Sequence, residues 1–512
     1  MHSGERKHGG NGILRAVFVG ISLLLQIGWL LLIVLELNKY STGISLLTSV
    51  IASVVVLRLY SRNTNSAYKM PWIMLIMALP VMGLSLYLMA EILGSSKWVR
   101  NRVEYARQST AKHLKQEEAV MSMLENRDIS TANQFRYLWQ GMHYPVYRGT
   151  DVQYHDFAVR GFARLKEDLE TAERFIFLEY FIVEDDRAFR EILDILVRKA
   201  AQGVEVRLMY DDVGSIGYVN LKFARRISQM GIQCRAFNPA LPVLNLFINH
   251  RDHRKITVID GKIGFTGGYN LANEYFGYSQ PYGVWKDTGI RLEGEAVRSL
   301  TATFLELWNV MSREKEDFAK YLDISHSVSG GGFVQPFGDD PLGDERTTEN
   351  VYLNLIANSK RYIWFITPYL MITDEMNRAL GLAARRGVDV RIITPGIPDK
   401  KTVYQLTRSY YAGLVRQGVR IFEYSPGFCH AKQCLCDGET ATIGTSNLDY
   451  RSLYLHFEND VLLYDCPAVK DMEEDFRQTF AQCQEVTEKY RTGRPAMLRL
   501  WQCILRLFAP MM

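Results

Sequence analysis

The sequence predicts an α/β protein in which two similar domains, each a mixed sheet flanked by helices, form one site about a pseudo-twofold axis. Transmembrane helices are expected to precede them. Two observations carry the prediction of two domains: a spaced motif from residue 253 to 270 recurs from 430 to 447, and strand–helix–strand alternation, with a glycine after each helix, occurs around both copies. A third, the uncharged runs near the N-terminus, predicts the membrane segments.

The repeated motif reads H-x-K-x4-D-x6-G, with an asparagine three residues after the glycine. One H-x-K-x4-D pattern is expected only ~0.02 times by chance among ten histidines, because Lys and Asp each fill about one position in 20. Two copies with the same trailing residues therefore indicate one active site built from two halves. The matching positions are His253, Lys255, Asp260, Gly267 and Asn270, then His430, Lys432, Asp437, Gly444 and Asn447.

Composition limits the possible functions. The chain has 512 residues, of which 47% are hydrophobic, and its formal charge of +4 is too small to favour nucleic acid as a partner. Seven cysteines form no secreted disulfide framework. Three of them crowd around His430, but their spacing lacks the usual C-x2-C pattern of zinc sites, so no metal is expected. Buried thiols in a reducing compartment are the expected alternative.

Residues 1–95 are predicted to be a membrane anchor with two or three hydrophobic segments. Residues 16–35 and 71–90 are uncharged runs that match the hydrocarbon thickness of a bilayer, and residues 43–57 form a shorter apolar run. Basic residues before the first run and after the last favour an even number of crossings with the catalytic part in the cytoplasm. The polar, helix-prone residues 96–140 are expected to form a connector.

Two domains are expected at 141–330 and 331–495. Buried strands at 204–210 and 388–394 each follow a helix that ends at a glycine. The halves differ most before the histidine, where the first contains an apolar stretch at 241–248 that the second lacks. This stretch could pack against the second half or contact lipid.

The repeated residues suit chemistry on a phosphate group. Residues two apart on a strand point to one face, so His253 projects with Lys255, and His430 with Lys432. The lysines and the amides of Asn270 and Asn447 would donate to phosphate oxygens. One imidazole would attack while the other protonates the leaving oxygen. No carboxylate cluster for Mg²⁺ and no P-loop is recognisable, so no cofactor is expected.

Four acidic residues are candidates for supporting roles. Asp260 and Asp437 belong to the motif, but each precedes a glycine in a turn-like sequence, which favours a structural role over direct chemistry. Asp287 and Glu458 each open a strand that follows one motif copy, and we expect each to orient the imidazole of its own half.

The duplicated motif resembles that of the phospholipase D superfamily, and within it the chain is most similar to bacterial cardiolipin synthases. Further support comes from the segments 178–182, 367–369 and 447–452. The resemblance implies phosphatidyl transfer between two phosphatidylglycerol molecules, giving cardiolipin and glycerol through a phosphohistidine, with His253 as nucleophile and His430 as general acid. It also implies a bacterial cell membrane location and contact with anionic lipid. A phospholipase D-type hydrolase or another phosphatidyltransferase remains the alternative, and the oligomeric state is open.

Residues 496–512 are predicted to be an amphipathic tail. Arg499 and Arg506 are seven residues apart and therefore share one face of a helix, opposite an apolar face. Such a helix could dock on the second domain or bind at a lipid interface.

Overall fold

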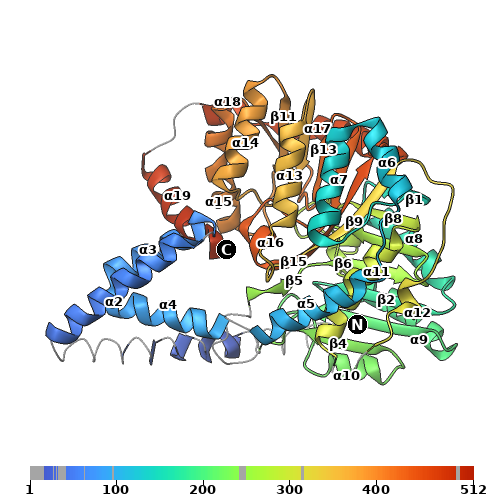
Figure 1. Ribbon diagram of the computed structural model, residues 1–512, viewed down its shortest axis with the longest axis horizontal. Helices are drawn as coiled ribbons and strands as arrows, with labels where there is room; N and C mark the ends of the chain where they lie inside the picture. The colour runs from blue at the N-terminus through green and yellow to red at the C-terminus, as the bar shows by residue number, and fades with distance from the viewer. Residues whose placement is uncertain are drawn as a thin grey trace, which may run out of the picture.

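Two α/β halves are stacked on each other, with a group of helices projecting from one side (Figure 1). The computed structural model describes residues 17–22, 24–26, 28, 29, 32, 42–62, 64–94, 97–240, 249–312, 316–491 and 496–511. Parts of the first predicted hydrophobic run, 16–35, and all of the apolar stretch 241–248 lie outside the described residues.

The first half is built on a seven-stranded mixed sheet with the order β1-β8-β7-β6-β2-β3-β4. The parallel strands of this sheet are β2 (Phe175–Tyr180), β3 (Glu205–Asp211) and β4 (Gln233–Phe237). The antiparallel side consists of β6 (Lys255–Ile259), β7 (Ile263–Gly267), β8 (Gly289–Gly294) and β1 (Thr150–His155). The helices of this half are α8 (Ala158–Glu170), α9 (Arg187–Ala201), α10 (Phe223–Ser228) and α11 (Val297–Val310).

The second half repeats this topology. Its sheet has the order β16-β12-β11-β10-β13-β14-β15-β5, and β9 also pairs with β15. Its strands are β9 (Phe333–Asp339), β10 (Tyr362–Ile366), β11 (Asp389–Pro395), β12 (Arg420–Tyr424), β13 (Gln433–Cys436), β14 (Thr440–Gly444), β15 (His456–Tyr464) and β16 (Cys483–Glu485). Its main helices are α13 (Thr347–Asn358), α14 (Asp374–Arg385), α15 (Lys401–Val415), α16 (Tyr450–Tyr454) and α17 (Pro467–Ala481). The predicted α/β class with two mixed sheets is confirmed.

The central strands form because their sequences are apolar on both faces. All six residues of β2 are buried, as expected for a strand that helices cover on both sides. Asp186 caps the N-terminus of helix α9, and its side chain accepts a hydrogen bond from Arg187 N. After the helix ends, the chain turns at Gly203, where φ is +92°. The corresponding helix α14 ends before Gly387, which has φ +96°. The predicted glycine stops are thus present in both halves.

A short strand joins the two halves. β5 (Arg251–Asp252) belongs by sequence to the first half, yet it pairs in parallel with β15 of the second. In the reverse direction, Lys286 of the first half forms a parallel bridge with Cys429, directly before the second motif. The backbone therefore crosses from half to half immediately before each motif histidine.

The N-terminal helices correct the membrane prediction. Along the described parts of the chain, no helix has the length and apolar character that crossing a membrane requires. The uncharged run 71–90 is divided between α3 (Ser66–Ala78) and α4 (Pro80–Gly94), with a break at Leu79, so neither helix reaches the ~20 residues of a span. The prediction of N-terminal transmembrane helices, and with it a multi-pass arrangement, is wrong for the described residues.

These helices instead pack on one another. A core of Ala52, Leu59, Ile76 and Tyr87 joins α2 (Thr42–Ser61), α3 and α4. The backbones of α3 and α4 approach closely, since a Cβ on Gly83 would lie 2.6 Å from the Cα of Ile76. Figure 1 shows this group, in blue, beside the C-terminal helix.

The two predicted accessory segments are helical and packed. Residues 97–142 form α5 (Lys97–Ala111), α6 (Glu118–Arg127) and α7 (Ile129–Met142), which bury Val103, Leu124 and Phe135 in the main core. The tail forms α19 (Ala496–Phe508), where Trp501 donates to Gln405 (3.1 Å) and Arg506 donates to Ser409 of α15. The tail is thus docked on the second half, while the domain limits themselves remain predictions.

Candidate active site

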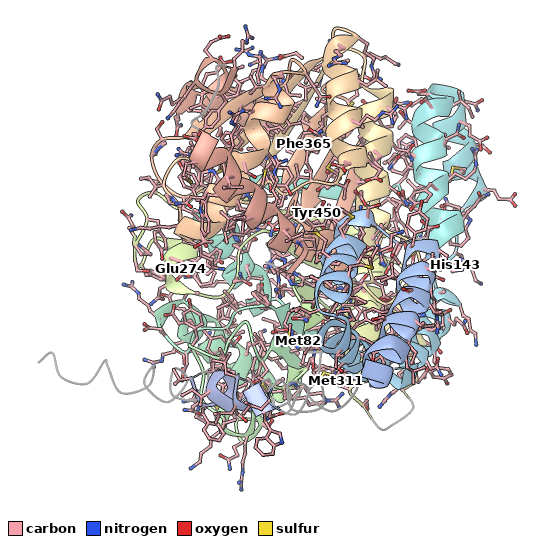
Figure 2. The ribbon with its side chains drawn as sticks, turned by 90° about the vertical axis from the view of Figure 1, so that its left-hand side faces the viewer. Met82, His143, Glu274, Met311, Phe365 and Tyr450 are labelled. Carbon is pink, nitrogen blue, oxygen red and sulfur yellow. The ribbon has the colours of Figure 1, made fainter. Side chains whose placement is uncertain are left out.

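Both motif histidines line one cavity between the two halves, with a volume of about 490 Å³. Glu274 also lines it, and Figure 2 shows this residue at the level where the green first half meets the orange second half. The wall contains aromatic side chains from both halves, including Phe181, Trp285, Tyr369 and Phe428. The prediction that the two copies meet in one site therefore agrees with the geometry.

His253 is oriented by Glu458. Its Nδ1 lies 2.9 Å from both Oε1 and Oε2 of that carboxylate, and the imidazole is only 7% exposed. Glu458 also accepts the hydroxyls of Thr445 (2.5 Å) and Ser452 (2.6 Å). Because the carboxylate oxygens act as acceptors here, the shared hydrogen is that of Nδ1, and the lone pair of Nε2 is left for the cavity.

His430 is oriented by Asp287. Its Nδ1 lies 2.6 Å from Oδ2 of Asp287, whose other oxygen accepts Thr288 N at 2.9 Å. Burial raises the pKa of Asp287 to about 7, against the nearby Lys432. The ammonium of Lys432 lies 2.7 Å from the same Nδ1 and can only donate. Nδ1 of His430 therefore faces both the Asp287 carboxyl and the Lys432 ammonium.

The orienting carboxylates are exchanged between the halves. We expected Asp287 to hold His253 and Glu458 to hold His430, but each carboxylate reaches the other histidine. The reason is the backbone crossing: His253 N donates to Phe457 O (2.9 Å), and His430 N donates to Lys286 O (2.7 Å). Each histidine therefore lies beside the strand that carries the opposite carboxylate.

The two lysines are buried beside their histidines. Lys255 and Lys432 are 2% and 1% exposed, and each Nζ donates to the backbone carbonyl of the histidine two residues before it. Burial lowers the pKa of Lys255 to about 7, against the attraction of Glu458, and that of Lys432 to about 8. Because a bound phosphate would favour the charged forms, these ammonium groups are suited to hold an anion.

Burial also keeps the imidazoles neutral. The pKa of His253 is held well below 6.5, first by burial and then by the charges of Lys255 and Lys432. The pKa of His430 is lowered in the same way by burial, Lys432 and Lys255. A neutral imidazole carries the lone pair that nucleophilic attack requires.

The motif asparagines both line the cavity, but they differ in their contacts. Asn270 accepts Ile182 N (3.0 Å) and donates to the hydroxyl of Tyr275 (2.9 Å). The side-chain oxygen of Asn447 is buried and has no hydrogen-bond partner in the described part of the chain. Each amide could contribute an N–H to a phosphate oxygen, as the sequence suggested.

The motif aspartates lie away from the cavity. Asp260 accepts the backbone N–H groups of Glu173, Arg174 and Phe175, each at 2.8 Å. Asp437 does the same for residues 360–362, at 2.7–2.9 Å. Both have positive φ, 54° and 56°, as part of a turn. Their contacts are structural, because each carboxylate fixes the start of the central strand to the hairpin.

Sequence reasoning missed the residues that pack against the imidazoles. His456 lies 5.4 Å from the ring of His253, and Trp285 lies 5.6 Å from the ring of His430, between ring centroids. Each stands two residues before an orienting carboxylate, a signal that the strand period could have revealed. His253, His456 and Glu458 also place ligand atoms within 4.8 Å of one another, a spacing that a metal ion could bridge.

Comparison with protein families gives two matches. A family model described as "Cardiolipin synthase, PLD-like domain" matches residues 165–308 and 352–480, together more than half of the chain. A second model, described as "Phospholipase D-nuclease N-terminal", matches residues 47–90. The first match covers both histidine motifs and both orienting carboxylates.

Relatives of similar length carry the same family description. The chain is 33% identical to a cardiolipin synthase of Geobacillus sp. (strain WCH70) over 93% of this chain and 95% of the relative. It is 38% identical to cardiolipin synthase 2 of Bacillus cereus over 69% of this chain and 68% of the relative.

A solved structure supports the fold independently. The phosphatidylserine synthase of Haemophilus influenzae superposes with a TM-score of 0.53, covering 70% of this chain and 93% of that one, at 16% sequence identity. The predicted enzyme class, a phosphatidyltransferase of the cardiolipin synthase type, is confirmed by the family match and the relatives. The chain belongs to the cardiolipin synthase family of PLD-like proteins.

Proposed function

We propose that this protein transfers a phosphatidyl group from one phosphatidylglycerol molecule to another, forming cardiolipin and glycerol through a phosphohistidine. The observation that carries the proposal is the pair of neutral, carboxylate-oriented imidazoles in one cavity, His253 on Glu458 and His430 on Asp287. The family and its named relatives support phosphatidylglycerol as the substrate.

The surroundings of the imidazoles support different roles for them. His253 directs Nδ1–H at the acceptor oxygens of Glu458, so its Nε2 lone pair is free to attack phosphorus. At His430, the ammonium of Lys432 and the carboxyl of Asp287, whose pKa is raised to about 7 by burial, both face Nδ1. His430 therefore keeps its hydrogen on Nε2, where it can protonate a leaving oxygen.

The first step joins the lipid to the enzyme. Nε2 of His253 forms a bond to phosphorus while the bond between phosphorus and the glycerol oxygen breaks. The proton on Nε2 of His430 passes to that oxygen while Nδ1 of the same ring takes the proton of the Asp287 carboxyl, so the ring stays neutral and glycerol leaves. Lys255 and Lys432, with the amides of Asn270 and Asn447, would stabilise the charge on the phosphate oxygens.

In the second step, His430 acts as a base instead of an acid. A hydroxyl of the second phosphatidylglycerol loses its proton to Nε2 of His430 while Nδ1 returns its proton to Asp287, and the hydroxyl oxygen bonds to phosphorus. The bond between phosphorus and nitrogen breaks, and its electron pair returns to Nε2 of His253. Cardiolipin is released with both imidazoles restored to their starting states.

Because the proposed substrate is a membrane lipid, we expect the reaction to occur at a bacterial membrane. Exposed apolar side chains support contact of the protein with lipid. Met497, Leu500 and Trp501 of α19 are 47–76% exposed, and Val54 and Leu57 of α2 are 60% and 68% exposed. Binding by such side chains would bury them at the interface without requiring a spanning helix.

The test uses purified protein and phosphatidylglycerol vesicles in the presence of a chelator. Formation of cardiolipin and glycerol in equal amounts supports the proposal. Phosphatidic acid as the only lipid product would instead identify a phospholipase D-type hydrolase, in which water replaces the second lipid. Activity that appears only when a divalent metal is restored would contradict the mechanism. It would indicate a metal site formed by His253, His456 and Glu458.

A further inference from the structure

The cavity contains a cation that the two-step mechanism does not use. Lys400 lines the same cavity as His253 and His430. Its Nζ lies 6.0 Å from the ring centroid of Tyr369, which lies 6.4 Å from that of Phe428, and Phe428 lies 5.7 Å from the ring of His430. Lys400 therefore lies on the His430 side of the cavity.

The reaction places the acceptor lipid on this side. If His253 attacks, the leaving glycerol oxygen lies opposite, next to His430, and the acceptor hydroxyl must later occupy the same position. The glycerol of the acceptor then separates that hydroxyl from its own phosphate by five bonds, or about 6 Å. A cation near His430, but farther from phosphorus than the motif lysines, would meet that second phosphate.

Lys400 has the free bonding capacity that such a role needs. Within the part of the chain that the structure describes, its ammonium makes no hydrogen bond or ion pair, and it lies 6.0 Å from the ring centroid of Tyr369. Asp399, the adjacent carboxylate in the cavity wall, already accepts the hydroxyl of Tyr369 at 2.6 Å. The exposed position of Lys400 at the rim leaves it accessible to a lipid that enters from outside.

The backbone at this position also favours an anion. Lys400 is the N-cap residue of α15, a helix of 15 residues, and no side chain caps its first turn, which contains no acidic residue. The first N–H groups of a helix lack partners within the helix, and they carry partial positive charge. Beside His430 in the same cavity, the Nε1–H of Trp285 has no hydrogen-bond partner among the described residues, so a donor on this side is left for an anionic ligand.

The other candidate cation is already engaged. Arg451 lines the His253 side of the cavity, where its charge acts on His253. Its Nε donates to Nε2 of His456 at 3.2 Å, so it is fixed against the wall. Lys400 is thus better placed than Arg451 to bind a second phosphate.

We propose that Lys400 binds the phosphate of the acceptor phospholipid and so directs the phosphohistidine toward an anionic lipid rather than a neutral alcohol. This assignment rests on the proposed function. It adds a substrate-selecting residue outside the repeated motif.

The test compares two acceptors in one assay. Mixed micelles of phosphatidylglycerol with labelled free glycerol report two products: cardiolipin, which needs an anionic acceptor, and labelled phosphatidylglycerol, which needs only a neutral one. We expect Lys400→Gln to lower the ratio of cardiolipin formation to glycerol exchange roughly tenfold, through a higher KM for the acceptor, as loss of a hydrogen bond to a charged group would. Lys400→Arg should restore most of the ratio.

Lys401→Gln is the matched control, because Lys401 carries the same charge at the same helix end but does not line the described cavity. Its ratio should equal that of the unchanged protein. An unchanged ratio in Lys400→Gln, an equal fall of both products, or a lowered ratio in Arg451→Gln instead would overturn the assignment. Failure of the unchanged protein to make either product would overturn the proposed function itself.

Discussion

The His253 and His430 half-sites share one topology but differ in the three residues that surround each imidazole. His253 has a glutamate, a threonine hydroxyl on that glutamate and a histidine ring beside it: Glu458, Thr445 and His456. The matching residues around His430 are an aspartate, a glycine and a tryptophan: Asp287, Gly268 and Trp285. The longer carboxylate is thus paired with added hydroxyl donors, and the shorter one with a glycine.

This difference shows how a duplicated motif can supply two chemical roles. Hydroxyl donors leave Glu458 as an acceptor for His253, whereas Asp287 is buried with its pKa raised to about 7 and stands beside His430 with the ammonium of Lys432. In the proposed mechanism, the same His-Lys pair therefore presents a lone pair on Nε2 of His253 and a hydrogen on Nε2 of His430. Asymmetry in the neighbours, rather than in the motif, would separate nucleophile from acid.

The largest expected effect comes from removing each imidazole in turn. His253→Ala and His430→Ala should each reduce cardiolipin formation by about 10⁴-fold or more. A phosphatidyl ester of p-nitrophenol has a leaving group that needs no acid, so it should restore the first step in His430→Ala alone, seen as a burst of p-nitrophenol and a trapped phosphatidyl-enzyme. A burst in His253→Ala would reverse the two roles.

The next largest effect on activity is expected from substitutions of Gly268 and Thr445, the residues that contact the two orienting carboxylates. A Cβ on Gly268 would lie 2.0 Å from Oδ1 of Asp287, so Gly268→Thr should displace the carboxylate and lower kcat/KM by about 10²-fold or more. Thr445→Gly removes only one donor to Glu458 and should cost about tenfold. Gly141→Thr, where the nearest atom lies 3.9 Å away, is the control. Equal losses at positions 268 and 445 would contradict the proposed difference between the half-sites.

The pH dependence of kcat/KM should reflect the protonation of the two buried lysines. The pKa of Lys255 is lowered to about 7 and that of Lys432 to about 8, so the ammonium forms are present below these values and are lost as the pH rises through them. We expect kcat/KM, which reflects the free enzyme, to decline above about pH 7–8. Lys255→Arg should move the decline to higher pH because arginine stays charged. An alkaline limb that does not move would assign the decline to another group.

The smallest effect on chemistry is expected at the motif aspartates. Asp260→Asn and Asp437→Asn each replace an oxygen that accepts backbone N–H groups with an amide, and should lower the free energy of unfolding by about 1–3 kcal/mol. Thermal unfolding would measure this loss, while kcat at a temperature well below Tm should change less than threefold. A loss of kcat comparable to that of His430→Ala would restore a direct catalytic role.

Particular residues show how much of the structure could be predicted from the sequence. Lys255 lies beside His253 and Lys432 beside His430, as their two-residue spacing suggested, although β6 begins only at Lys255 and β13 only after Lys432. The two Asp-Gly pairs stand in turns, where both aspartates have positive φ. The prediction of a membrane span at 71–90 was wrong because hydropathy does not reveal a break in a helix. Leu79 divides this run into two helices that pack together. His456 and Trp285 were missed, although each stands two residues before an orienting carboxylate, where the strand period places both side chains on one face.

The sequence by itself determined the duplicated α/β architecture and the reactive groups, because strand and helix periods and motif spacing are local properties of the chain. Only the tertiary structure decided which carboxylate serves which imidazole. β5 pairs with β15, and His430 N donates to Lys286 O, so the backbone crosses between halves just before each histidine. Pairing between distant strands depends on the packing of the two sheets, which no local pattern records.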